Sequence, residues 1–186
     1  LEMPHNATFD DAVSLIFGGQ TAIYFLEKAK IVEMSNPKIL IIGATGSVGT
    51  GAIQIERYHK ADITVVCSSE GFELVKSLGV YNVTLYDKVD FTKQTNKFDI
   101  IFDAVGKTNK QECKHLLKEK GEYKSVDGSG YASETLKQLQ LLKKLFEKGK
   151  FKAVIDKAFP MDKIVEAHRY VDTGRKKGNV VLRISK

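Results

Sequence analysis

The sequence has little of what marks secreted, membrane-spanning or disulfide-linked proteins. Its 186 residues include two cysteines, three prolines and no tryptophan. Cys67 and Cys113 are far apart and neither lies in a C-x-x-C motif, which argues against a disulfide framework and a structural zinc site. No apolar run approaches the roughly 20 residues of a membrane helix, and the N-terminus lacks a basic segment followed by an apolar one. We therefore expect a cytoplasmic protein with no membrane partner.

Patterns that bind metals or nucleic acids are also scarce. The four histidines form no pair at ligand spacing, so we expect no metal site. The formal net charge is +6, but the lysines are spread along the chain, and the densest basic cluster is Arg175-Lys176-Lys177. A nucleic-acid footprint is a larger patch or stripe. We therefore expect no nucleic-acid partner, although the positive field would attract an anionic ligand.

The most informative segment that is present runs from Lys38 to Gly49, with the sequence KILIIGATGSVG. Four consecutive apolar residues predict a strand buried on both faces of a parallel sheet, followed by a glycine-rich turn and a helix N-terminus. Such a turn offers backbone N–H groups and a helix dipole to an anion. Gly46 would let the backbone approach a pyrophosphate, and Gly49 would let the helix pack closely on the strand. Ala44 stands where the usual G-x-G-x-x-G motif has its first glycine.

The rest of the chain alternates between predicted strands and helices. The expected strands are Lys38–Gly43, Ile63–Cys67, Val83–Tyr86, Phe98–Asp103, Glu122–Val126, Ala153–Ile155 and Val180–Ile184. The expected helices are Thr8–Lys30 with a break at Gly18-Gly19, Ser47–His59, Gly71–Leu78, Asn109–Lys118, Glu134–Lys148 and Met161–Asp172. This alternation predicts an α/β fold, a Rossmann-type doubly wound parallel sheet in three layers.

Ligands of such sheets bind at the carboxyl ends of the strands. The segments that follow the predicted strands are mostly rich in Gly, Ser or Asp; they are Ala44–Gly49, Ser68–Gly71, Tyr86–Lys88, Ala104–Lys107 and Asp127–Gly130. A single segment of this kind is an ordinary turn, because Gly and Ser are common turn residues. Five of them at one sheet edge favour a nucleotide site.

The end of the second strand bears on which nucleotide binds. An NAD site usually has an acid there to hold the ribose 2′-hydroxyl. Asp62 lies at the wrong end of the strand and is interpreted as an exposed turn residue. The strand ends in Cys67-Ser68-Ser69, which suits a 2′-phosphate better than a carboxylate would, although Glu70 follows and no Arg or Lys is adjacent in sequence. We therefore favour NADP(H), with NAD(H) as the alternative.

Several motifs together resemble one family. They are Gly19-Gln20-Thr21-Ala22, the turn Gly43–Gly49, Glu73–Gly79, Val83–Tyr86, Phe98–Gly106, Glu166–Tyr170 and Gly178–Leu182. In this combination they resemble the medium-chain dehydrogenase/reductase superfamily, in its quinone-oxidoreductase-like, zinc-independent branch. The resemblance implies three parts: an interdomain helix and linker (1–36), an NAD(P)-binding Rossmann domain (37–150), and a C-terminal segment (151–186). In relatives this last segment packs on an N-terminal substrate domain. We expect that domain to be absent here and the chain alone to catalyse poorly.

The resemblance also implies a role for each matching position. Thr21 would lie near the nicotinamide. In the glycine turn Ser47 and Val48 would sit over the pyrophosphate, and Thr45, Gly46 and Gly49 would belong to the same cofactor-binding turn. The adenosine end would meet Ser68, Ser69 and Tyr86. The bridging region would border Ala104 and Val105, and the nicotinamide side Asp127 and Gly128. No residue is named as catalytic, and Asp103 is interpreted as a cap of the turn after its strand.

The implied reaction is hydride transfer from NADPH to a quinone or an activated alkene or carbonyl compound, with the nicotinamide carrying the chemistry. The substrate would be a small molecule, and a homodimer is expected because relatives pair through this domain. One alternative is an atypical short-chain reductase or a non-catalytic NAD(P)-binding redox sensor. A short-chain reductase needs Tyr-x-x-x-Lys for proton transfer. Tyr24 and Lys28 have that spacing but precede the glycine turn, which argues against the enzyme and leaves the sensor open.

Overall fold

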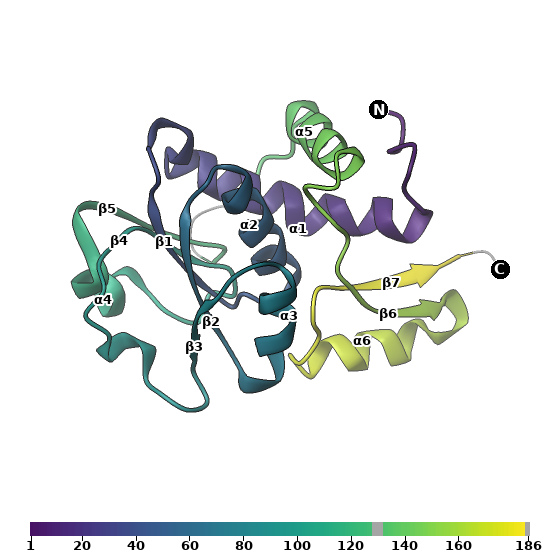
Figure 1. The fold of residues 1–186 in the computed structure, drawn as a ribbon. Helices are drawn as coiled ribbons and strands as arrows, with labels where there is room; N and C mark the ends of the chain where they lie inside the picture. Colours follow the sequence, from purple (N-terminus) through teal and green to yellow (C-terminus); the bar gives the residue numbers. More distant parts are fainter. Residues whose placement is uncertain (128–131, 185–186) are drawn as a thin grey trace.

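The computed structural model describes residues 1–127 and 132–184. A five-stranded parallel sheet has the order β3-β2-β1-β4-β5 (Figure 1). Its strands are β1 Lys38–Ile42, β2 Asp62–Cys67, β3 Asn82–Leu85, β4 Phe98–Asp103 and β5 Leu117–Ser125. The run of apolar residues in β1 lies at the centre, where four of its five residues are buried, as expected for a strand that is covered on both faces.

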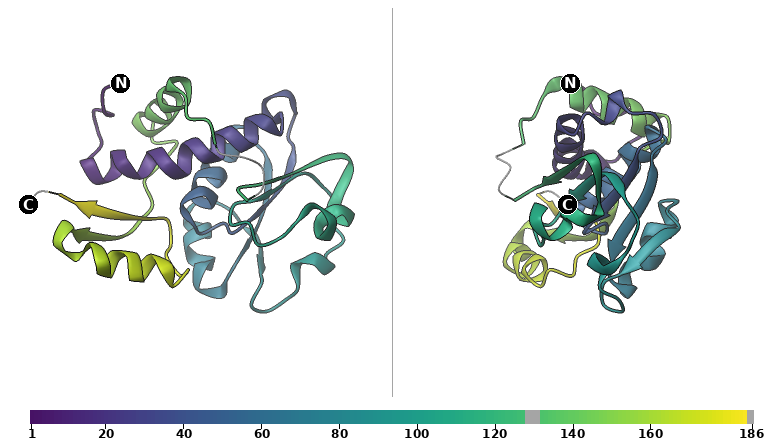
Figure 2. Two further views of the ribbon diagram at one scale, coloured as in Figure 1. Left: turned by 180° about the vertical axis from the view of Figure 1, so that it is seen from behind. Right: turned by 90° about the vertical axis from the view of Figure 1, so that its left-hand side faces the viewer.

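Alternate residues of the strands face two separate hydrophobic cores. Ile39 and Ile41 of β1 join the larger core with α1 Phe9–Lys28, α2 Ser47–Tyr58, α3 Phe72–Ser77 and α5 Leu136–Glu147. Leu40 and Ile42 face a smaller core, which the short helix α4 Lys110–Cys113 helps to cover. Figure 2 shows these helices on the two sides of the sheet. The predicted three-layer, doubly wound fold is therefore confirmed. The helical layer over the smaller core is much thinner than the one over the larger core.

Helix α1 begins as predicted and continues where a break was expected. Thr8 forms a capping box with Asp11, in which each side chain accepts a hydrogen bond from the other residue's backbone. The predicted break at Gly18-Gly19 is wrong, because α1 runs through both glycines to Lys28. A Cβ atom on Gly18 would lie 2.3 Å from the Ser47 carbonyl oxygen, so the missing side chain lets α1 approach α2 closely.

Two other predicted elements have different bounds. The helix expected over 109–118 ends early: α4 is followed by a 3₁₀ turn, Lys114–Leu116, and β5 begins at Leu117 rather than Glu122. The buried Leu116 anchors that turn in the smaller core. The strand expected at Ala153–Ile155 is β6 Ile155–Pro160, which starts where the prediction ended.

The last two strands do not join the main sheet. β6 and β7 Asn179–Arg183 form a parallel two-stranded sheet of their own, connected by α6 Ile164–Asp172. We call residues 155–183 the C-terminal unit. It lies beside the first turns of α1, near both chain ends (Figures 1 and 2). Arg183 reaches α1 through an ion pair with Asp10, in which the nitrogen and oxygen atoms are 2.5 Å apart.

Candidate functional site

The glycine turn between β1 and α2 has the geometry of an anion cradle. Gly43 has φ +75°, a conformation that favours glycine. A Cβ atom on Gly49 would lie 2.2 Å from the Gly43 carbonyl oxygen, so α2 can pack on the strand only without a side chain there. A Cβ atom on Gly46 would meet its nearest neighbour only at 3.7 Å. Packing therefore does not require a glycine at position 46, where the backbone pairs with Gly178 and the residue lines the cavity described below.

Helix α2 presents its N-terminus at this turn. Gly46 is the N-cap residue and supplies no side-chain cap to the first turn. The leading N–H groups of a helix have no intrahelical partner, and together with the helix dipole they favour a bound anion. Ser47 and Val48 begin that first turn, with the side chain of Val48 buried in the core. The backbone, rather than the side chain, of Val48 is thus the part that a pyrophosphate could contact.

A cavity of about 590 Å³ opens at the carboxyl ends of the strands. Its walls bring together segments that are far apart in sequence; they include Gly43, Thr45, Gly46, Cys67, Tyr86, Val105, Thr108 and Lys176. Tyr86 is 59% exposed and forms part of the rim. This is the sheet edge at which the sequence predicts a nucleotide, and four predicted site residues, Thr45, Gly46, Tyr86 and Val105, line the cavity.

A second cavity of about 300 Å³ shares part of this lining. It contains the predicted Ser68 together with Glu70, Asp87 and four residues of the C-terminal unit, Gly174, Arg175, Lys176 and Lys177. Sequence reasoning treated these three basic residues only as a short charged cluster. Their position just before the glycine that precedes the last strand indicates a turn, but not a binding site. No pattern along the chain indicates that this loop folds back onto the first glycine turn.

Direct contacts hold the C-terminal loop against the glycine turn. The Gly178 N–H donates to the Thr45 carbonyl at 2.7 Å, and the Ser47 hydroxyl donates to the Gly178 carbonyl at 2.8 Å. The Lys176 ammonium donates to the Ser47 Oγ and the Gly178 carbonyl, both at 2.8 Å. Burial lowers the pKa of Lys176, and Asp156 opposes that shift. The loop thus places a partly buried cation at the N-terminus of α2.

The remaining predicted site residues have more varied surroundings. Ser69 donates its N–H to the carboxylate of Asp87, a residue that lines the second cavity, at 2.9 Å. Ala104 packs against the larger core, and Asp127 lies against Gly106 after β5. Thr21 lies on α1 one turn after Gly18, which packs on Ser47. Gly128 lies outside the described residues. The roles of these positions stay predictions.

Asp103, at the end of β4, is fully buried and bonded within its own turn. One carboxylate oxygen accepts the N–H groups of Val105 and Gly106 at 3.0 and 2.8 Å. The other accepts the Thr108 N–H at 2.7 Å and hydroxyl at 2.8 Å. Burial raises the pKa of the adjacent Tyr123 to about 12. Asp103 therefore holds the loop that carries Val105, which supports a capping role.

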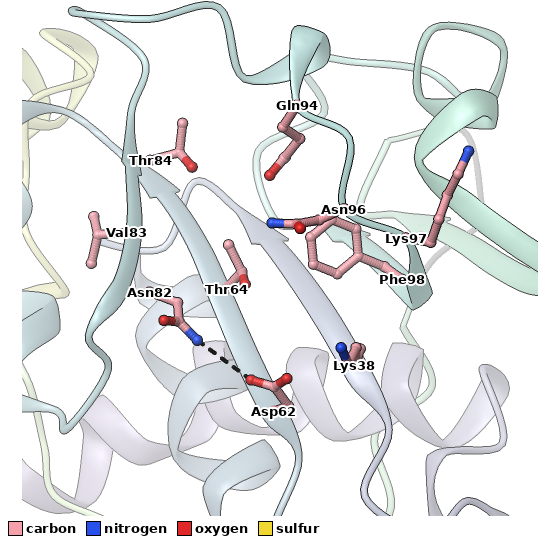
Figure 3. Close-up of a pocket in the computed structure, with 10 residues that line it drawn as sticks. All are labelled: Lys38, Asp62, Thr64, Asn82, Val83, Thr84, Gln94, Asn96, Lys97 and Phe98. Atoms are coloured by element: carbon pink, nitrogen blue, oxygen red, sulfur yellow. Dashed lines mark hydrogen bonds between the residues drawn. The ribbon is translucent and has the colours of Figure 1, made fainter.

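A third hollow, of about 360 Å³, lies toward the amino ends of β1, β2 and β3 (Figure 3). Thr64, Thr84, Gln94 and Asn96 surround it. Asp62 lies at its lower rim and accepts a hydrogen bond from Asn82 at 3.4 Å. Asp62 is thus at the start of β2, at the other end of the strand from Cys67, as the sequence indicated. Because ligands of parallel sheets bind at the carboxyl ends, this hollow is not the candidate site.

Residues 1–127 and 132–184 contain no group of three or more His, Cys, Asp or Glu side chains placed to hold a metal ion. None of the described helices is both long enough and apolar enough to cross a membrane. Both cysteines are buried and unpaired, and burial raises the pKa of the Cys67 thiol to about 11.

The fold and the turn are those of a Rossmann-type α/β domain. Comparison with known proteins narrows the family to which the chain is similar. Residues 128–182 match the family described as zinc-binding dehydrogenase. The chain is 34% identical to the 2-methylene-furan-3-one reductase of Solanum lycopersicum, over 96% of this chain and 48% of that protein. It is 30% identical to the chloroplastic NADPH-dependent alkenal/one oxidoreductase of Arabidopsis thaliana, with the same coverage.

A solved structure shows the same fold. The quinone oxidoreductase from Coxiella burnetii superimposes with a TM-score of 0.83 at 20% identity, covering 100% of this chain and 64% of that one. The chain spans about half the length of the curated relatives named above. The sequence matches bear out the resemblance to the medium-chain dehydrogenase/reductase superfamily, and the structural match shows the same fold.

Proposed function

We propose that this chain is the NADP(H)-binding domain of an oxidoreductase that transfers hydride from NADPH to an activated alkene, carbonyl compound or quinone. One observation carries the proposal: the glycine turn and the basic C-terminal loop meet at a cavity of about 590 Å³ at the carboxyl ends of the strands. The names of the relatives from tomato and Arabidopsis, a 2-methylene-furan-3-one reductase and an NADPH-dependent alkenal/one oxidoreductase, support this substrate class.

The residues present fit a dinucleotide phosphate. Gly46 lines the cavity without a side chain, the first turn of α2 offers N–H donors, and the Lys176 ammonium lies 2.8 Å from the Ser47 hydroxyl. NADPH would supply the hydride when bound, and the protein would supply its position and exclude water. Thr45 to Val48 would bind the diphosphate, and Tyr86 would cover the adenosine end. Val105, held by Asp103, would border the middle of the cofactor.

The second candidate function is a non-catalytic NAD(P)-binding sensor. A short-chain reductase would need its Tyr-x-x-x-Lys pair in the site, and here Lys28 lies over the Tyr24 ring, 4.9 Å from its centroid, on α1. Neither residue lines the cavities at the carboxyl ends of the strands. This placement argues against short-chain reductase chemistry, while a sensor would use the same cofactor site. Turnover therefore discriminates between the two candidate functions, and binding alone does not.

Calorimetric titration of the purified chain with NADPH and NADH tests the cofactor proposal. We expect saturable binding with NADPH the tighter ligand; absence of binding by either would overturn the proposal. Loss of NADPH absorbance in the presence of an α,β-unsaturated ketone or a para-quinone tests hydride transfer. This second assay is made on the full-length protein, since the chain spans about half the length of its relatives. Consumption above the substrate-free rate supports the oxidoreductase, whereas cofactor binding without consumption by the full-length protein favours the sensor.

Three finer expectations belong to the same proposal. Zinc independence is tested by metal analysis of active protein, and a homodimer by sedimentation at several concentrations. The compartment is tested by imaging the full-length protein, since the Arabidopsis relative is described as chloroplastic. Bound zinc that is required for activity, a monomer at every concentration, or organelle import would each correct one of these expectations.

A further inference from the structure

The cavity of about 300 Å³ beside the glycine turn contains three basic residues that the sequence places far from any nucleotide motif. Arg175, Lys176 and Lys177 belong to the loop between α6 and β7, whereas Ser68 and Glu70 follow β2. In Rossmann domains the end of the second strand is where the adenosine ribose is held. The basic loop of the C-terminal unit therefore faces the ribose end of the predicted cofactor site.

The three cations are not equivalent. Lys176 is already engaged, because its ammonium donates to Ser47 and to the Gly178 carbonyl. The Lys177 backbone N–H donates to the Asp156 carboxylate at 3.0 Å, which fixes the course of the loop and leaves its side chain to line the cavity. Arg175 is exposed and also lines the cavity. Arg175 and Lys177 are thus the two cations placed for a ligand at this end.

The acidic residues of the same cavity do not cancel this charge. The Asp87 carboxylate accepts the Ser69 N–H, and its hydrogen bonds with Ser69 hold its pKa below the usual range. Glu70 is exposed and is the second acid in the lining. With two acids against three cations, the cavity retains an excess of positive charge. A ribose 2′-phosphate carries the opposite charge, and an arginine fork can bind it in bidentate geometry.

We propose that Arg175 and Lys177 recognise the 2′-phosphate of NADPH, so that the C-terminal unit determines cofactor preference in place of a basic residue after β2. The proposal rests on the proposed function, since it concerns the same cofactor site. In this arrangement the Ser68 hydroxyl would lie beside the phosphate, and Glu70 would make no favourable contact with it. A loop more than 100 residues beyond β2 in sequence would then complete the adenosine end of the site.

The test measures four ligands on the wild-type chain and on the double variant Arg175→Ala/Lys177→Ala: NADPH, NADH, 2′,5′-ADP and 5′-AMP. We expect affinity for NADPH and 2′,5′-ADP to fall about 10- to 100-fold, and affinity for NADH and 5′-AMP to change less than about 3-fold. A 10- to 100-fold loss corresponds to about 1.4–2.7 kcal/mol for the two contacts together. Lys163→Ala is the matched control, because Lys163 is a cation of the same unit that pairs with Glu166 outside the cavity.

The outcomes separate this inference from the proposed function. A selective loss of the 2′-phosphorylated ligands, with the charge-conserving Arg175→Lys/Lys177→Arg variant retaining most of the preference, supports it. An equal loss of all four ligands, or no loss at all, overturns it, while saturable binding by the wild-type chain still supports the proposed function. Failure of the wild-type chain to bind any dinucleotide overturns both. Circular dichroism melting of each variant shows whether a loss of affinity reflects unfolding.

Discussion

The five-stranded sheet and the C-terminal unit are both parallel α/β structures, yet they bury their strands to very different degrees. In β1 only Lys38 is exposed and the other four residues are buried. In β7 a single residue, Val181, is buried, and in β6 none is. Hydrophobic burial stabilises the sheet domain from within. The C-terminal unit buries too few apolar residues for this, so its stability depends on its contacts with the rest of the chain.

Polar contacts hold the C-terminal unit together and onto the sheet domain. The Tyr170 hydroxyl and the Lys177 N–H both donate to the Asp156 carboxylate. Gly178 joins the unit to the glycine turn at Thr45. Units with few buried apolar contacts open at lower free energy than the global transition. The comparison therefore predicts that the unit carrying the basic loop is the less stable part, and that its attachment at Gly178 couples it to the candidate cofactor site.

The largest expected effect falls on the sheet domain. Gly49→Val would place side-chain atoms within 2.2 Å of the Gly43 carbonyl oxygen and 2.8 Å of the Ala44 backbone. Because backbone atoms cannot move aside as a flexible side chain can, we expect a loss of about 3–4 kcal/mol in the free energy of unfolding. Urea denaturation followed by circular dichroism measures it.

Gly46→Ala is the matched control for that variant. Its Cβ would lie 3.7 Å from the nearest neighbour, an ordinary contact, so the fold should lose less than about 1 kcal/mol. Its methyl group would instead face the ligand, and we expect weaker NADPH binding at nearly unchanged stability. Equal destabilisation by the two substitutions would show that Gly46 is also a packing residue, contrary to the assignment.

The sheet domain is also the part that the sequence predicts well. β1, β2, β4 and α2 have bounds within one residue of expectation, because buried apolar runs and a glycine turn are local signals. The predictions are wrong where tertiary contacts, rather than local sequence signals, determine the structure. Gly18 and Gly19 indicate a helix break locally, but in the fold they permit close contacts with Ser47 and Leu142. Likewise β6 and β7 pair with each other, and no periodicity within either strand indicates the partner.

The candidate site likewise has one part that the sequence predicts and one part that it does not. Thr45, Gly46, Ser68 and Tyr86 were predicted, because each follows a strand with a clear hydrophobic signal. The basic loop 175–177 was missed as part of the site, because it reaches β2 only through the fold. Its contact with the turn depends on a hydrogen bond between Gly178 and Thr45, which are 133 positions apart.

A second prediction concerns Glu56 on α2, a charged residue in the best-packed part of the molecule. Its side chain is fully buried, and neither carboxylate oxygen has a hydrogen-bond partner among the described residues. Burial raises its pKa to about 8. The folded protein therefore keeps a proton that the unfolded chain releases near pH 4.5, so stability falls as pH rises through this window.

Glu56→Gln tests this directly. Between about pH 5 and 8 the wild-type free energy of unfolding should fall relative to the variant by about 1.4 kcal/mol per pH unit, reaching about 3 kcal/mol near pH 7. Below about pH 4 both forms carry a neutral side chain, so the two curves should run parallel there. Denaturation across this range measures the difference, and parallel curves throughout would mean that Glu56 ionises normally in the fold.

The smallest expected effect falls on the C-terminal unit and distinguishes its stability from that of the five-stranded sheet. Gly178 has φ +77°, and a Cβ atom there would lie 2.3 Å from the Val154 carbonyl oxygen. Gly178→Ala should cost about 2 kcal/mol, from backbone strain and this contact. Gly174→Ala is the control: its φ is +69°, but a Cβ atom there would meet nothing within 4 Å, so only the strain of about 1 kcal/mol applies.

Amide hydrogen exchange distinguishes where these losses appear. If the C-terminal unit opens as a separate unit, Gly178→Ala should speed exchange in β6, α6 and β7 and leave β1 and β4 protected. It should also weaken NADPH binding, because Lys176 and its neighbours would lose their position beside Ser47. Uniformly faster exchange across both regions would mean instead that the two sheets unfold together, and that the contrast in their burial does not produce a contrast in their stability.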